Sequence, residues 1–183
     1  VHQGHQKLFS LAKKYKKKFD FNIGVLTFEP MPKMFFNKKI KNFRISNFDQ
    51  KINLLKKLDV DFVINKKFDN KFSKIKSFNF IKKIIYKKLN AKFIFVSNNF
   101  KFGNKRLGNV SQLINYETQY GYKIIKPEPL KMKNKVVSSS LIRKFLEEGF
   151  LSKANKLLKR NWRIIGKVEK GRQVGKKIGF PTC

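Results

Sequence analysis

Strand-like and helix-like segments alternate along the first two thirds of the chain, and this alternation restricts the possible folds more than any other feature. Each strand-like segment is a short apolar run, and the helix-like stretches carry apolar residues at helical spacing. The predicted strands lie at residues 21–28, 60–65, 92–97 and 122–127, and the predicted helices lie at 4–19, 46–58, 77–89 and 110–121. Strands separated by helices are typical of βαβ units. The sequence therefore predicts an α/β fold with a mostly parallel sheet and helices on both faces.

Two residue types mark the ends of these helices. Ser46 followed by Asp49 resembles a capping box at the start of the second helix. Gly121 is a plausible C-cap of the fourth, because glycine adopts the left-handed conformation in which many helices end.

The pattern changes near residue 161. Helices are predicted at 138–150 and at about 152–160, whereas 161–170 has the pattern of an antiparallel strand and is followed by a glycine-rich stretch. We therefore expect a domain boundary that separates residues 1–160 from residues 161–183. A strand and a loop without further strands cannot bury an apolar face. Residues 162–183 are thus expected to pack loosely, with Trp162 and Phe180 more exposed than Phe95.

The chain carries a net charge of +33, from 44 basic and 11 acidic residues. Such a charge normally indicates an anionic partner. Arginine, which reads phosphates and bases better than lysine, occurs at only six positions. The lysines are better explained by an AT-rich genome, and a nucleic-acid partner is not expected, although a non-catalytic lysine-rich nucleic-acid-binding module stays open. The charge would still attract anionic small molecules.

Other bulk features argue against a membrane or secreted protein. No apolar run approaches the roughly 18 residues of a membrane span. Cys183 is the single cysteine, so an internal disulfide is excluded and a cytoplasmic location is expected. No signal peptide is visible. In folds of this kind a strand should precede the first helix, and the chain begins at Val1 without one, so we interpret it as a piece of a longer protein.

The two histidines of the chain are three residues apart. His2 and His5 flank Gly4 immediately ahead of the first predicted helix. In α/β folds, ligands bind where the carboxyl ends of strands meet helix N-termini. Imidazole is a compact hydrogen-bond donor whose protonation responds to a nearby phosphate. A simple surface helix start with a capping glycine is the alternative interpretation.

A second polar cluster lies near the end of the first domain. Ser138, Ser139 and Ser140 precede a predicted helix, and Arg143 lies one turn inside it. Backbone N–H groups, hydroxyls and a guanidinium would converge there, which suits a polyphosphate. Taken alone, the cluster is also compatible with an ordinary serine N-cap and a surface arginine.

Together, these motifs resemble a known family. Residues 2–5 resemble the HxGH motif of nucleotidylyltransferases, and 138–143 is similar to their SSTxIR motif, with serine in place of threonine. The stretches TFEPMP at 27–32, SNNFKFG at 97–103 and GKKIGFPT at 175–182 resemble the bacterial bifunctional riboflavin kinase and FAD synthetase family. The resemblance runs in order along essentially all 183 residues.

The resemblance implies a Rossmann-like nucleotidylyltransferase fold over residues 1–160 that transfers AMP from ATP to FMN, giving FAD and pyrophosphate with Mg²⁺ as cofactor. His2, His5 and Arg143 would be the catalytic residues, and ATP would also contact Gly4, Ser139 and Ser140. We therefore expect both motifs to line one pocket at the carboxyl end of the parallel sheet. Another HxGH adenylyltransferase, with pantetheine phosphate or nicotinamide mononucleotide as acceptor, is a second possibility that the NNFKFG and GFPT stretches disfavour.

The resemblance also assigns a flavin side. Aromatic rings stack on an isoalloxazine, and an asparagine amide can pair with its polar edge. The implied flavin-binding residues are Pro30, Pro32, Phe36, Asn99 and Phe102.

By the same resemblance, residues 161–183 are the first strand and phosphate loop of a truncated β-barrel riboflavin kinase domain. Gly175, Gly179 and Thr182 would belong to its phosphate loop, and Thr182 would lie near a Mg²⁺ ion. The rest of the barrel is absent, so this chain is not expected to phosphorylate riboflavin, whereas the longer protein is.

Overall fold

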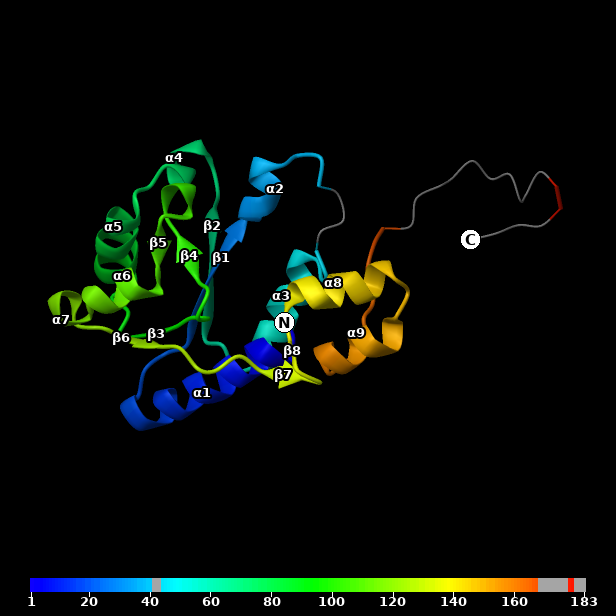
Figure 1. Cartoon of the computed structure of the whole chain (residues 1–183), viewed down its shortest axis with the longest axis horizontal. Helices are drawn as coiled ribbons and strands as arrows, with labels where there is room; N and C mark the ends of the chain where they lie inside the picture. The colour runs from blue at the N-terminus through cyan, green and yellow to red at the C-terminus, as the bar shows by residue number, and fades with distance from the viewer. Residues whose placement is uncertain (41–43, 168–177, 180–183) are drawn as a thin grey trace.

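The computed structural model of the chain describes residues 1–40, 44–167 and 178–179. Two pairs of parallel strands lie at its centre (Figure 1). Strand β1 (Gly24–Glu29) pairs with β2 (Phe62–Lys67), with Gly24 opposite Phe62, and β3 (Phe93–Phe95) pairs with β6 (Lys123–Ile125). The predicted parallel pairing is thus confirmed. Within the described residues, however, backbone hydrogen bonds do not join the two pairs into one sheet.

Two short antiparallel ladders lie outside these pairs. β4 (Lys101–Phe102) pairs with β5 (Gly108–Asn109), and β7 (Lys131–Met132) pairs with β8 (Lys135–Val136). Residues 98–108, which lie between a predicted strand and a predicted helix, also contain the short 3₁₀ helix η2 (Asn104–Arg106).

Each predicted helix position holds a helix, and two further short helices, α2 (Pro32–Phe36) and α4 (Asn70–Ser73), occur where none was predicted. The longer helices are α1 (Gln3–Phe19), α3 (Phe48–Lys56), α8 (Ser139–Glu147) and α9 (Leu151–Leu158). The other short ones are α5 (Ser77–Asn79), α6 (Val110–Asn115) and α7 (Glu117–Tyr120). The predicted helix at 77–89 continues from α5 as the π-helix η1 (Phe80–Lys88).

Of the two predictions about helix ends, the C-cap at Gly121 is confirmed and the capping box at Ser46 is wrong by one residue. Gly121 is the C-cap of α7 with φ of +64°, as expected. At the start of α3 the capping box is one residue later than expected. The amide N–H of Gln50 donates to Asn47 Oδ1 over 2.8 Å, and the N–H of Asn47 donates to Gln50 Oε1 over 2.9 Å. Asn47 therefore caps the helix in place of Ser46, by the same reciprocal mechanism.

Two hydrophobic cores hold these elements. The first lies between η1, α6 and the strands β3 and β6, and includes the fully buried Ile81 and Leu113. The second packs α8 on α9 around Ile142 and Ala154, both with no exposed area. The second core fixes the first turn of α8, which carries the serine cluster.

The segment after α9 departs from its prediction. Residues 161–167 form no strand; 168–170 and Phe180 lie outside the described residues. Trp162 and Phe95 are both half-buried, so the contrast expected between them stays a prediction. The indole N–H of Trp162 donates to the carbonyl of Ile45 over 2.8 Å, and the ring packs against the second core. The packing does not continue along the segment, because Ile164, two residues after Trp162, is 79% exposed.

Candidate active site

The histidine pair forms the N-terminal end of α1. His2 is the N-cap residue, and its ring stacks on that of His5 with centroids 3.9 Å apart. His2 is only 7% exposed, and within the described residues its Nδ1 is buried without a hydrogen-bond partner. A buried polar atom without a partner costs free energy. The pair is therefore poised to donate to or accept from a group that enters the site.

Both imidazoles favour the neutral form. Burial lowers the pKa of His2 from 6.5 to about 4. The pKa of His5 is also lowered, first by desolvation from nearby protein atoms and then by the neighbouring His2, although the residue as a whole is exposed. A neutral imidazole still offers one N–H donor. An approaching phosphate would favour the protonated form and strengthen the contact.

Gly4 brings the first motif against the second. A Cβ atom built on Gly4 would lie 3.3 Å from the carbonyl oxygen of Val137 and 3.0 Å from Cε1 of His2. Val137 directly precedes the serine cluster, so the two motifs adjoin although some 135 residues separate them in sequence. The side chain of Gln6 also donates to the carbonyl of Leu158 in α9 over 3.4 Å, which ties α1 to the second core.

The serine cluster begins α8. Ser138 is the N-cap, and its Oγ accepts from the N–H of Leu141 over 3.2 Å. Ser139 and Ser140 therefore belong to the first turn of the helix instead of preceding it. Arg143 is half-buried one turn later, where burial lowers its pKa and Glu147 opposes the shift. A helix N-terminus with free N–H groups and two hydroxyls suits an anion.

Lys51 places a positive charge beside the histidines, and no sequence pattern singled it out. Its ammonium donates to Thr27 Oγ1 near the carboxyl end of β1. Burial lowers the pKa of Lys51, as does Arg44, which is ion-paired with Glu29. The charge of Lys51 in turn contributes to the lowered pKa of His5. In a chain this rich in lysine, only the fold distinguishes this one.

Phe36 lies at the edge of a cavity on the proposed flavin side. The ring is 68% exposed, and Pro32 provides the first residue of the helix α2 that carries it. The cavity has a volume of about 550 Å³ and is lined by Phe35, Phe36, Lys38, Asn70, Ser73, Lys74, Asn104 and Lys105. Pro30, which is exposed, precedes this helix.

The remaining two flavin candidates lie elsewhere. Phe102 is 7% exposed and belongs to the first core, with its ring 5.3 Å from that of Phe80. Asn99 is exposed, and its Oδ1 accepts from the hydroxyl of Ser97 over 3.0 Å. The structure thus brings Phe36 to the cavity and leaves Phe102 beneath the surface. Asn104, which follows the predicted motif directly, lines the cavity instead of Asn99.

Only one of the three residues assigned to the kinase phosphate loop lies among the described residues. Gly175 and Thr182 lie outside the described residues, and Gly179 has φ of +81° with open space beside it. Over the described part of the chain, no group of three or more His, Cys, Asp or Glu side chains could hold a metal ion. No helix among the described residues has the length and apolarity to cross a membrane.

Two family models and several named proteins match the sequence of the chain. The family model described as FAD synthetase matches residues 1–141, and that described as riboflavin kinase matches residues 158–183. Proteins named bifunctional riboflavin kinase/FMN adenylyltransferase match the whole chain, with 40% identity in Buchnera aphidicola subsp. Schizaphis graminum and 31% in Escherichia coli K12. The chain spans 59% and 58% of those proteins.

A solved structure shares the fold. A crystal structure titled macrolide-efflux protein, from Streptococcus pneumoniae, superposes with a TM-score of 0.78 at 27% sequence identity, covering 88% of this chain and 61% of that one. The superposition supports a mixed α/β architecture with small parallel sheets. With a family model matched over residues 1–141, the chain belongs to the FAD synthetase family.

Proposed function

We propose that this chain is the FMN adenylyltransferase part of a longer protein and has the Rossmann-like nucleotidylyltransferase fold over residues 1–160. The reaction transfers AMP from ATP to FMN and yields FAD and pyrophosphate. One observation carries the proposal: Gly4 lies against Val137, so the histidine pair and the N-terminus of α8 adjoin. The names of the relatives support the same activity.

The chemical step is a single displacement at phosphorus. A phosphate oxygen of FMN attacks the α-phosphorus of ATP, the bond from that phosphorus to the α,β-bridging oxygen breaks, and pyrophosphate leaves with the electron pair. No covalent enzyme intermediate is needed. Catalysis of such a step rests on positioning and on preorganised donors for the developing charge.

His2, His5 and Lys51 serve the α-phosphate side. The two imidazoles are neutral in the free protein, so they donate N–H groups without repelling each other as paired cations would. Lys51 adds a fixed charge, held toward the site by Thr27. Gly4 keeps the backbone close, since any side chain there would press on His2 or on Val137.

The first turn of α8 serves the leaving group. Ser139 and Ser140 offer hydroxyls beside the free N–H groups of the helix, and Arg143 offers a guanidinium. Mg²⁺ arrives with ATP as the metal–nucleotide substrate and screens its phosphates. The described residues form no carboxylate cage of their own for it.

The flavin ring occupies the cavity beside Phe36. Exposed aromatic rings stack on a flat heterocycle, and the lysines at the cavity rim suit the phosphate of FMN. Pro30 and Pro32 shape the approach to α2, whereas Phe102 supports the site from the core and Asn99 lies at the surface nearby in sequence. FMN is thus the acceptor that distinguishes this site from those of other HxGH enzymes.

The longer protein would also phosphorylate riboflavin to FMN, which the adenylyltransferase then consumes. The riboflavin kinase match over residues 158–183 and the bifunctional names of the relatives favour this second activity. Gly175, Gly179 and Thr182 would form part of its phosphate and Mg²⁺ site. The substrates are small molecules, and the cytoplasm, where a lone cysteine stays reduced, is the expected location.

Incubation with FMN, ATP and Mg²⁺ tests the proposal. The full-length protein should produce FAD and release one pyrophosphate per FAD, both measured by chromatography and a coupled phosphate assay. Pantetheine phosphate and nicotinamide mononucleotide serve as competing acceptors. Faster adenylylation of either one than of FMN would refute the assignment.

A further inference from the structure

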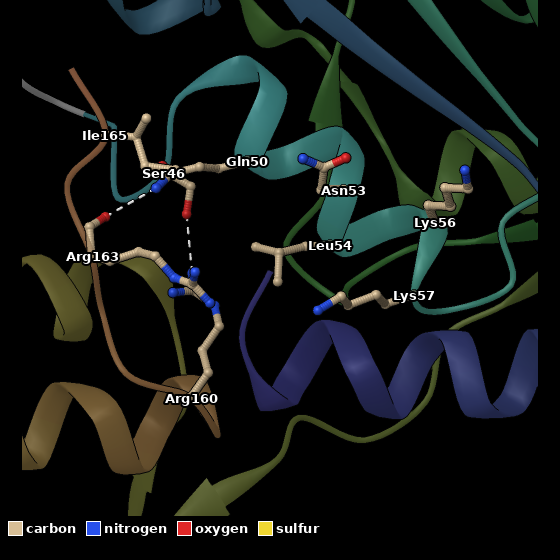
Figure 2. Close-up of a pocket in the computed structure, with 9 residues that line it drawn as sticks. All are labelled: Ser46, Gln50, Asn53, Leu54, Lys56, Lys57, Arg160, Arg163 and Ile165. Atoms are coloured by element: carbon tan, nitrogen blue, oxygen red, sulfur yellow. Dashed lines mark hydrogen bonds between the residues drawn. The ribbon is translucent and has the colours of Figure 1, made fainter. Parts of the chain in front are cut away.

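A second cavity lies between α3 and the segment that follows α9 (Figure 2). Its volume is about 500 Å³. The lining residues are Ser46, Gln50, Asn53, Leu54, Lys56, Lys57, Arg160, Arg163 and Ile165. Its walls therefore come from one face of α3 and from the first residues of the region that matches riboflavin kinase, which begins at residue 158.

Positive charge dominates this cavity. Four of the lining residues are basic and none is acidic. Over the described residues, Lys56, Lys57 and Arg163 form no ion pair with a carboxylate. Lysine-rich composition alone does not explain the arginines, because arginine occurs at six positions in the chain and two of them line this cavity.

Arg160 makes two hydrogen bonds, but one of its guanidinium N–H donors has no partner among the described residues. One guanidinium nitrogen donates to Ser46 Oγ over 3.0 Å, and another donates to the carbonyl of Asn161 over 3.2 Å. Its Nε is buried and has no hydrogen-bond partner among the described residues. Burial first, and then the charge of Arg163, lower the pKa of Arg160. Two guanidiniums thus repel each other with no carboxylate between them.

Gln50 fixes the other wall. Its side-chain amide donates to the carbonyl of Arg163 over 3.0 Å, which pins the segment after α9 to α3 (Figure 2). Since this tether acts on the backbone, the side chain of Arg163 keeps its donors for a ligand. The planar guanidinium fork matches phosphate oxygens in pairs.

We propose that this cavity binds a polyphosphate group, either free or as part of a nucleotide, at a site separate from the histidine pair. Each phosphate oxygen replaces a missing partner of the arginines and removes their mutual repulsion. The cavity lies near the histidine pair, because the charges of Arg160 and Lys51 both contribute to the lowered pKa of the Val1 amino group, but none of the residues proposed to hold ATP lines it. Lys51, on the same helix, is bonded instead to Thr27 on β1.

Calorimetric titration of the full chain with inorganic pyrophosphate tests this inference. The Arg143→Gln background weakens the part of the proposed active site assigned to pyrophosphate, so pyrophosphate binding that persists there reports the second cavity and does not depend on the proposed function. In that background, Arg163→Gln should weaken binding about tenfold or more, the effect of losing a charge-assisted hydrogen bond. Arg106→Gln, which removes an exposed arginine elsewhere, should leave it unchanged.

Two results would overturn the inference. One is a pyrophosphate affinity that Arg163→Gln leaves unchanged; the other is an equal loss in the Arg106→Gln control, which would indicate a general charge effect. Thermal unfolding of each variant shows whether the fold is kept, and since Arg163 is exposed it should be. A parallel titration with ADP identifies the source of the polyphosphate: tighter binding than pyrophosphate, also weakened by Arg163→Gln, indicates a nucleotide.

Discussion

Gly4 and Val137 lie in contact, although one stands near the start of α1 and the other just before α8. A Cβ on Gly4 would come within 3.3 Å of the Val137 carbonyl oxygen, closer than such contacts normally are. The glycine therefore permits the approach of two polypeptide segments that each contribute polar groups to one region. No helical or strand pattern in the sequence could reveal this contact.

Gly4→Ala tests the contact. Alanine normally stabilises a helix relative to glycine, by about 1 kcal/mol. Here the added methyl would press on the His2 ring at 3.0 Å and on the Val137 carbonyl, so we expect no gain in stability and a loss of FAD formation of about tenfold to a hundredfold. Gly166→Ala, a position with open space, is the control. A stabilised and fully active Gly4→Ala variant would contradict the contact.

His5→Ala separates chemistry from flavin binding. Losing one preorganised donor to a developing oxyanion lowers kcat by about 10²–10³. We expect that loss in FAD formation, with FMN affinity nearly unchanged, because His5 lies on α1 and the proposed flavin cavity is lined from α2, α4 and η2. FMN titration by fluorescence and FAD yield measure the two effects. Near-normal turnover would show that the imidazole has no role in the displacement.

The Lys51→Met substitution tests whether the charge of Lys51 contributes to ATP binding and turnover. Methionine keeps most of the side-chain volume and removes the charge, so we expect a raised KM for ATP and a lower kcat, together about tenfold or more in kcat/KM. His5 should also become easier to protonate, since Lys51 lowers its pKa. The matched control is Lys14→Met, an exposed lysine on α1. Equal effects of both changes would assign the loss to net charge.

The pKa of His2 links stability to pH. In the folded chain it is about 4, below its ordinary 6.5, so between these values the unfolded state binds more protons. The free energy of unfolding is therefore highest above pH 6.5 and falls as the pH drops toward 4, by at most about 3 kcal/mol from this residue. Urea unfolding at several pH values should show a shallower fall in His2→Asn. His5 acts in the same direction, so His5→Asn is measured beside it.

Most helices could be predicted from the sequence, because the patterns that indicate them depend on residues that lie close together along the chain. The apolar spacing that placed α1 and α8, and the glycine that ends α7, depend only on neighbouring residues. The capping box at α3 missed by one position because Ser46 and Asn47 are both good N-caps, and only the tertiary entry angle decides between them. Within residues 1–40 and 44–167, the parallel strands form two separate pairs and not the single sheet expected, because which strands become neighbours depends on the topology of the whole domain.

The site was partly predictable for the same reason. The two histidines, and the serines with Arg143, stood out as compact motifs, but the position of Lys51 depends on how α3 packs against β1. The strand expected at 161–170 is absent over 161–167, where Trp162 instead finds a partner in the carbonyl of Ile45. A buried indole N–H needs a hydrogen-bond acceptor, and here the tertiary structure provides it, so hydrophobic periodicity could not predict this contact.

Phe36 and Phe102 provide the sharpest test of the flavin side, because sequence reasoning treated them alike and the structure does not. Ring contacts connect them through Phe68, Phe72 and Phe80, with centroid distances of 5.8, 5.7, 6.4 and 5.3 Å. One end of this chain of rings is exposed at the cavity, and the other is buried in the first core. Substitution should therefore have different consequences at the two ends.

Phe36→Ala removes an exposed ring, so we expect little change in the free energy of unfolding and an FMN affinity lowered by about 1 kcal/mol or more. Phe102→Ala leaves a cavity in the core, which costs about 3–5 kcal/mol of stability. Denaturant unfolding and FMN titration of both variants measure this contrast. If Phe102→Ala keeps the stability of the parent chain and loses FMN binding, Phe102 contacts the flavin directly and the assignment of its ring to the core is wrong.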